Sequence, residues 1–166
     1  MTQTTVPPIG GKEHLPPTSG TEAVADILER ELDSTIREWL SLVEKEPDLI
    51  HVPLSFEERT GHLPRLLHDV IARLRLDKTS NAPISIAASQ HGKLRLKQGY
   101  TAAMVVDESR ILQVCIFSML HRNEHCVKFS KLLPDVVTIA DEVDAQLKQQ
   151  ILCFLPATHT AKSAKS

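Results

Sequence analysis

The stretch SQHGKLRLKQGY, residues 89–100, contains one histidine, three cationic side chains and two glycines. Gly99 is expected to end a helix, because glycine accepts the left-handed backbone conformation that closes helices. Thr101 can then cap a further helix, whose apolar residues recur at helical spacing to about Arg122. The stretch therefore predicts two helices joined by a short turn at Gly99 and Tyr100.

Two helices are expected before this hairpin. A capping-box pattern at Ser19–Glu22 precedes a long amphipathic segment that continues to Pro47. A second box, Ser55–Glu58, opens a short turn, and a further apolar stripe then runs to about Leu76 with Pro64 in its first turn. The sequence thus places two helices ahead of the central stretch.

The remaining boundaries come from prolines. Asn81 and Pro83 form a start signal for the helix that ends at Gly99. Residues 123–134 are expected to form a loop with some helical turn, and a last helix is expected from Pro134 to Phe154. Five helices without a convincing strand predict an all-α fold, either an antiparallel bundle or a globin-like packing, with no sheet.

Composition predicts one helical domain over residues 21–155, with a disordered leader at 1–20 and a disordered tail at 156–166. The net charge of −2, with acidic and basic residues mixed along the chain, argues against nucleic acid as a partner. Three cysteines without paired short spacing fit a reducing cytoplasm. The chain has no signal-peptide pattern and no apolar run long enough for a membrane span.

A polar cluster is expected where the central hairpin folds back on itself. Arg95 and Glu108 each interrupt the inward stripe of their helix, and His91 lies on the same face as Arg95. A buried charge is costly alone and tolerable when paired, so the three side chains are expected to lie together as internal scaffolding. The residues that follow His91 do not match phosphotransfer or histidine-kinase motifs, and no phosphate loop, nucleophile elbow or zinc-hydrolase signature is present. The sequence therefore predicts no catalytic residue.

Metal and haem binding remain alternatives. His121 and His125 are four residues apart with Cys126 adjacent, so a helix could direct them to one metal ion, although no further ligands are indicated by spacing. In a haem protein, His68 or His91 would be the axial ligand, but an aromatic content of 4% is low for lining a porphyrin. The prediction is that the chain needs no cofactor, with a transition metal or haem as the alternative.

Three parts of the sequence resemble a known family. They are the string HG-x-x-R-x-x-x-GY from His91 to Tyr100, ILERELDSTIREWL at 27–40 and HLPRLLHDVIARL at 62–74. Over 23–155 the chain resembles the N-terminal domain of RsbRD-type co-antagonists of the bacterial stress-response regulator RsbT. That domain also precedes histidine kinases. The resemblance implies a non-catalytic sensor with a haem-free globin-like fold, which pairs as a homodimer and signals to a protein partner.

The last predicted helix carries apolar residues at alternating spacings of three and four. These residues predict a seam for a second copy of the chain or another partner. The residues assigned to this interface are Val136, Ala140, Val143, Leu147 and Phe154. The same spacing also fits a helix that packs within its own domain, and both possibilities stay open. Two functions remain: a signalling input and interaction domain, or a metal- or haem-binding helical sensor.

Overall fold

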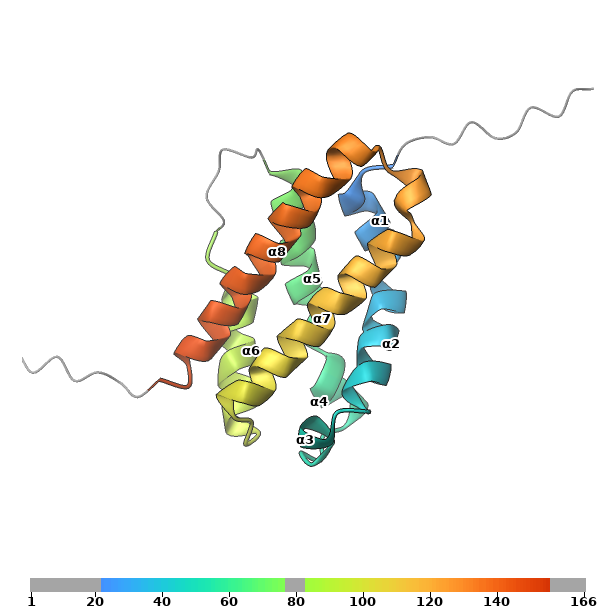
Figure 1. Ribbon diagram of the computed structural model, residues 1–166. Coiled ribbons are helices and arrows are strands. Elements are labelled where there is room, and N and C mark those ends of the chain that lie inside the picture. Colours follow the sequence, from blue (N-terminus) through green and yellow to red (C-terminus); the bar gives the residue numbers. More distant parts are fainter. Residues whose placement is uncertain (1–21, 77–82, 156–166) are drawn as a thin grey trace, which may run out of the picture.

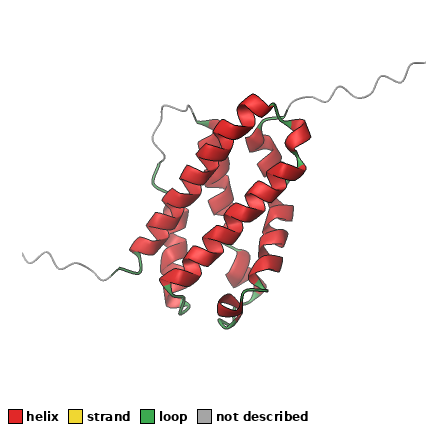
Figure 2. Ribbon diagram, in the orientation of Figure 1, coloured by secondary structure: helices red, strands yellow, loops and turns green. Residues whose placement is uncertain are grey.

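The computed structural model describes residues 22–76 and 83–155, and every regular element within them is helical (Figure 2). The first helices are α1 (Val24–Arg30), α2 (Leu32–Val43), α3 (Pro47–Ile50), α4 (Phe56–Thr60) and α5 (Leu63–Arg75). The later ones are α6 (Ile86–Lys97), α7 (Ala102–Arg122), the 3-10 turn η1 (Glu124–Cys126) and α8 (Phe129–Leu152). The all-α prediction is confirmed. The expected leader and tail lie outside the described residues.

The expected number of about five helices is too low, because the first predicted helix is divided and two short helices follow it. α1 ends at Arg30, and the ψ of 10° at Glu31 interrupts the helical path before α2 begins at Leu32. The region between α2 and α5, expected to hold one short turn, contains two short helices, α3 and α4. Neither proline nor glycine marks the break at Glu31, so sequence signals for helix ends did not reveal it.

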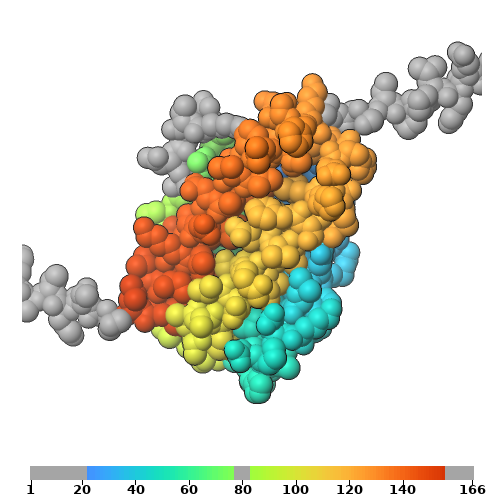
Figure 3. Space-filling model, viewed as in Figure 1, coloured from blue at the N-terminus to red at the C-terminus, as the bar shows by residue number. Residues whose placement is uncertain are grey.

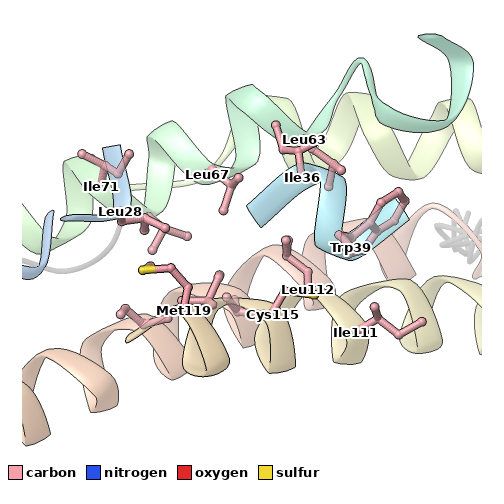
Figure 4. Close-up of a cluster of buried hydrophobic side chains, with 14 of the residues drawn as sticks. Leu28, Ile36, Trp39, Leu63, Leu67, Ile71, Ile111, Leu112, Cys115 and Met119 are labelled. Carbon is pink, nitrogen blue, oxygen red and sulfur yellow. The ribbon is translucent and has the colours of Figure 1, made fainter. Parts of the chain in front are cut away.

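The long helices pack in two groups around one core. α7 and α8 lie side by side and run in opposite directions, with α1, α2, α5 and α6 behind them (Figure 1). Between α7 and the group of α1, α2 and α5, apolar side chains such as Leu28, Trp39, Leu67 and Met119 are completely buried (Figure 4). Burial of this apolar surface is the main stabilising contribution to the fold.

Side-chain caps fix several helix boundaries. The Ser55–Glu58 capping box is present, with the Ser55 amide donating to Glu58 Oε2 at 2.8 Å. The Thr101 hydroxyl accepts from the backbone N–H of Met104 at 3.2 Å, and Gly99 closes α6 with a φ of 85°. These three predictions are confirmed. α6, however, is capped by Ser85 rather than at Asn81 or Pro83, and Asn81 lies outside the described residues.

α1 also begins later than expected. Its N-cap is Ala23, and no side chain caps it, so the predicted box with Ser19 does not start this helix. Ser19 itself lies outside the described residues. Glu22 instead binds Arg30 of the same helix at 2.7 Å.

α8 begins at Phe129, five residues before the expected start, and Pro134 lies inside it. α8 contacts α5, α6 and α7, so much of its apolar surface faces the protein's own core. Among the positions assigned to an intermolecular seam, Val143 is buried and the others are partly buried: Val136, Ala140, Leu147 and Phe154. The residues of the expected seam therefore pack largely within their own chain, because α8 lies against α5, α6 and α7.

Gly92 determines how closely α6 approaches α8. A Cβ atom at this position would lie 2.7 Å from both the Cα and the carbonyl oxygen of Gln150, and 3.1 Å from Cys153 Sγ. Only glycine leaves enough space for this helix crossing. None of the described helices is long and apolar enough to cross a membrane.

Candidate functional site

The structure brings His91, Arg95 and Glu108 together between α6 and α7. Arg95 Nε donates to Glu108 Oε2 at 2.9 Å, and His91 Nε2 lies 3.4 Å from the same oxygen. The exposed fractions are 3% for His91, 0% for Arg95 and 3% for Glu108. We call these three residues the buried polar cluster.

Tyr100 and Arg59 extend this cluster. The Tyr100 hydroxyl donates to Glu108 Oε1 at 2.9 Å, so both carboxylate oxygens are engaged. Arg59 Nη1 lies 3.3 Å from the Tyr100 oxygen, and its other hydrogen bonds go to the backbone carbonyls of Leu49 and Val52. The contacts connect the α3–α4 region to the central hairpin.

Arg95 has further acceptors besides Glu108. It donates to the carbonyl oxygens of Glu58 and Arg59 at 3.2 and 2.9 Å, and to Gln98 Oε1 at 2.8 Å. Its guanidinium carbon also lies 4.7 Å from the centre of the Tyr100 ring, within cation–π range. The buried positive charge is therefore well compensated by hydrogen-bond acceptors.

His62, which lies just before α5, stacks on His91. The ring centroids are 3.6 Å apart and the planes differ by 13°. The Trp39 ring approaches His62 edge-on at 6.2 Å, while Trp39 Nε1 donates to the carbonyl oxygen of Glu108 at 3.1 Å. The Nδ1 atoms of His62 and His91 are both buried without a hydrogen-bond partner among the described residues.

Burial controls the protonation of the histidines. It lowers the pKa of His62 well below its usual value, and the neighbouring His91 and Arg95 lower it further. Burial also lowers the pKa of His91, although contact with Glu108 opposes this shift. Near neutral pH, both imidazoles are therefore uncharged.

The pKa values of the Glu108 carboxyl and the Tyr100 phenol shift in opposite directions. Burial alone would raise the pKa of Glu108, but His91 and Arg95 outweigh it and hold that pKa below its usual value. Burial, together with the charge of Glu108, raises the pKa of Tyr100 to about 12. The cluster therefore combines an ionised carboxylate with a protonated phenol and a cationic guanidinium.

Two cavities adjoin the histidine pair. An open pocket of about 340 Å³ between the α4–α5 turn and α6 reaches His62 and His91. A small cavity of about 10 Å³ is lined by the same two histidines, Glu108 and polar groups of other helices. The small cavity has space for about one water molecule.

The expected metal-ligating positions near the end of α7 are arranged differently. α7 ends at Arg122, so His125 lies in the 3-10 turn and does not follow His121 on one helix. Both histidines are exposed, and His121 Nδ1 lies 3.2 Å from Glu124. Among the described residues, His121, His125 and Cys126 do not belong to any group of three clustered metal-ligating side chains.

Sequence reasoning missed His62, Arg59 and Trp39 as neighbours of the buried polar cluster. His62 and Arg59 are separated from His91 by about thirty residues, and only the packing of α4 and α5 against α6 brings them together. Tyr100 belongs to the quoted stretch but was not assigned to the cluster. Its position in the turn after Gly99, between the two helices, was the signal that could have placed it there.

No protein-family model, curated protein or solved structure matches this chain. The resemblance to RsbRD-type N-terminal domains therefore remains a hypothesis. Functional inference rests on the chemistry and geometry of the described residues.

Proposed function

We propose that the protein is a non-catalytic helical signalling input and interaction domain, of the kind used in bacterial stress-response and two-component systems. It acts by dimerisation and by changes in helix packing. The buried polar cluster supports a non-catalytic role because both oxygens of Glu108 are engaged by Arg95 and Tyr100. A general acid or base must instead reach a substrate proton.

The observation that carries the interaction proposal is an exposed apolar row on α8. Phe129, Leu133 and Val137 follow at intervals of four residues, and their exposed fractions are 81%, 61% and 63%. Residues spaced in this way lie on one side of a helix. We call them the α8 stripe, and exposed apolar surface of this kind is typical of an interaction site.

The position of α8 connects this stripe to the interior. Side chains of α7 and α8 cover much of the face shown in Figure 3, and the inner side of α8 packs against α6. α6 carries His91 and Arg95, and Gly92 keeps it in close contact with α8. The α8 stripe lies toward the N-terminal end of α8 and the contact with Gly92 is at Gln150, near the other end. A partner that moves α8 as a rigid helix would therefore shift its contact with α6, which gives a physical route for signal transfer.

A variant that carries Leu133→Glu and Val137→Glu tests the proposal. We expect a dimer for the unmodified chain and a monomer for this variant, measured by light scattering. Lys148→Glu is a matched control, because it changes the charge by the same amount at an exposed position of α8, and it should remain dimeric. If the unmodified chain is a monomer, or the double variant remains a dimer, dimerisation through this stripe is wrong.

A metal-binding helical sensor is the second candidate. His62, His91 and Glu108 favour a small ion over haem, because the cavity beside them measures only about 10 Å³. Metal analysis and absorbance in the Soret region of freshly purified protein distinguish these cofactors.

A further inference from the structure

We propose that His62, His91 and Glu108 bind one divalent transition-metal ion of the zinc or ferrous class. One ligand atom from each residue lies within 4.8 Å of the others. Within residues 22–76 and 83–155, this is the one group of three or more metal-ligating side chains that lies so close together. Two imidazoles and one carboxylate form a donor set suited to these ions.

The spacing of His91 and Glu108 fits coordination. His91 Nε2 and Glu108 Oε2 are 3.4 Å apart, whereas charge-assisted N–H···O bonds are usually about 2.7–2.9 Å long. Two ligands at roughly 2.0–2.1 Å from a tetrahedral zinc ion lie about 3.4 Å from each other. The separation of these two atoms therefore matches two ligands of one ion.

The buried nitrogens of the two histidines also bear on metal binding. Each imidazole also has a buried Nδ1 without a hydrogen-bond partner among the described residues. Such atoms are rare in proteins, because an unsatisfied buried polar group is destabilising. Coordination through Nδ1 would satisfy that atom in His62, whereas His91 faces Glu108 through Nε2, so an ion held there leaves the Nδ1 of His91 unpaired within the described part of the chain.

The surroundings provide both space and access. The cavity of about 10 Å³ beside the three ligands is also lined by Ser109, Gln146 and Gln150. Zinc with three protein ligands commonly keeps a water as its fourth ligand, and these polar groups could hydrogen-bond to it. The open pocket reaches both histidines and gives an ion a path from solvent.

Arg95 opposes binding, because its positive charge lies beside Glu108. Its hydrogen bonds to Glu58, Arg59 and Gln98 nevertheless stabilise that charge independently of the carboxylate. A carboxylate offers about four lone-pair directions, so Glu108 can accept from Arg95 and Tyr100 and still ligate an ion. Donors of this kind orient the ligands of metal sites.

The rings of His62 and His91 are nearly parallel, so binding of one ion by both requires a change in their orientation. An ion between stacked imidazoles would lie outside both ring planes, so coordination requires His62 to tilt relative to His91. His62 is the partly buried member of the pair and borders the open pocket, which leaves it space to turn.

Isothermal titration of the chelator-treated full chain with Zn²⁺, followed by Co²⁺ absorption spectroscopy, tests this inference. We expect one ion per chain and visible Co²⁺ bands of a site with nitrogen and oxygen ligands. His62→Phe keeps a flat ring but removes both nitrogens, and it should weaken binding by about tenfold or more. The control His121→Ala/His125→Ala removes two exposed histidines and should bind as the unmodified chain does.

Absence of binding by the folded, unmodified chain would overturn the inference. So would undiminished binding by folded His62→Phe, or loss of binding in the control. X-ray absorption of the zinc-loaded unmodified chain keeps the test decisive if His62→Phe does not fold. Two imidazoles and oxygen ligands are expected, whereas sulfur ligation would place the ion elsewhere. The light-scattering test concerns the α8 stripe and is independent of these results.

Discussion

Glu108 is the residue at which the interior contacts converge. Its carboxylate accepts from Arg95 and Tyr100 and lies beside His91, while its carbonyl accepts from Trp39. One side chain on α7 thus interacts with α6 and with the turn that follows it, and its backbone interacts with α2. Such a buried ion pair adds little net stability relative to an apolar core, but removal of one member is costly.

Glu108→Ala should lower the free energy of unfolding by about 3–5 kcal/mol, because it leaves the charge of Arg95 buried without its carboxylate. Chemical denaturation measures this change. Arg122→Ala removes a half-exposed pair with Glu38 and serves as the control, with an expected loss below about 1 kcal/mol. Equal losses in the two variants would contradict a special role for the buried pair.

Stability should fall on mild acidification because of His62 and His91. Their pKa values in the folded protein are lowered, whereas unfolded histidine titrates near pH 6.5. The unfolded chain therefore takes up protons first, and stability present above that pH is lost as the pH falls toward the folded values. The Tm should decrease between about pH 7.5 and about pH 5.5.

His62→Phe should reduce this pH dependence, because it removes one of the two buried imidazoles. His121→Ala/His125→Ala should retain it, since both of those histidines are exposed. A Tm that is constant over this pH range in the unmodified chain would contradict the expected protonation states.

The sequence indicated Arg95 and Glu108 because each breaks an apolar stripe, and His91 because it lies on the same face as Arg95. A short turn joins the two helices. His62 and Arg59 carried no such signal. They lie near the ends of short segments, and their approach to His91 and Arg95 depends on tertiary packing. Local periodicity therefore predicts contacts within a hairpin better than contacts between distant segments.

The crossing of α6 and α8 depends on Gly92. Gly92→Ala should destabilise the protein by about 1–3 kcal/mol, because the added methyl group collides with the backbone of Gln150. Lys93→Ala changes an exposed neighbour on α6 and should alter stability by less than about 0.5 kcal/mol. Thermal or chemical unfolding distinguishes the two. A neutral effect of Gly92→Ala would show that the helices can separate easily.

Pro134 should weaken α8, because its nitrogen cannot donate to the carbonyl of Ser130 within the helix. Pro134→Ala should therefore raise the free energy of unfolding, by up to about 3 kcal/mol. Pro64 lies in the first turn of α5, where proline fits well, and Pro64→Ala should give no such gain. Denaturant titrations measure the free energy of unfolding of both variants. Equal changes in the two would contradict the claim that Pro134 weakens α8.

Helix ends were predictable where a side chain or glycine defines them. Ser55 and Thr101 cap helices with their side chains, and Gly99 ends one with a positive φ. All three roles were predicted from the sequence. The break at Glu31 lacks such a signal. The start of α8 was placed too late, because Pro134 was interpreted as a boundary although the helix accommodates it.

The whole molecule should unfold in one step, because the contacts of Arg59 and Glu108 join segments from both halves of the chain. Trp39 is the single tryptophan, is completely buried and donates to Glu108. Its fluorescence and the helical circular dichroism signal should give the same denaturation midpoint. A fluorescence transition at lower denaturant would instead show that α2 separates before the other helices.

The all-α class of the fold was predictable from the sequence, but which side of α8 faces the core and which faces outward was not. Apolar spacing marked α8 as a packing helix, yet it could not show which neighbour each side chain meets. In the structure, Val143 faces the protein's own core, whereas Leu133 and Val137 face outward. That difference depends on the rotation of α8 against α5, α6 and α7.

Arg59 donates to the carbonyl oxygen of Leu49 in α3 and to that of Val52 in the segment between α3 and α4. Recognition of main-chain atoms does not depend on which side chains the segment carries. Pro53 is exposed and should accept an engineered label without loss of the loop's shape, whereas His51 contacts the carbonyl oxygen of Pro47 through Nδ1 and should be kept.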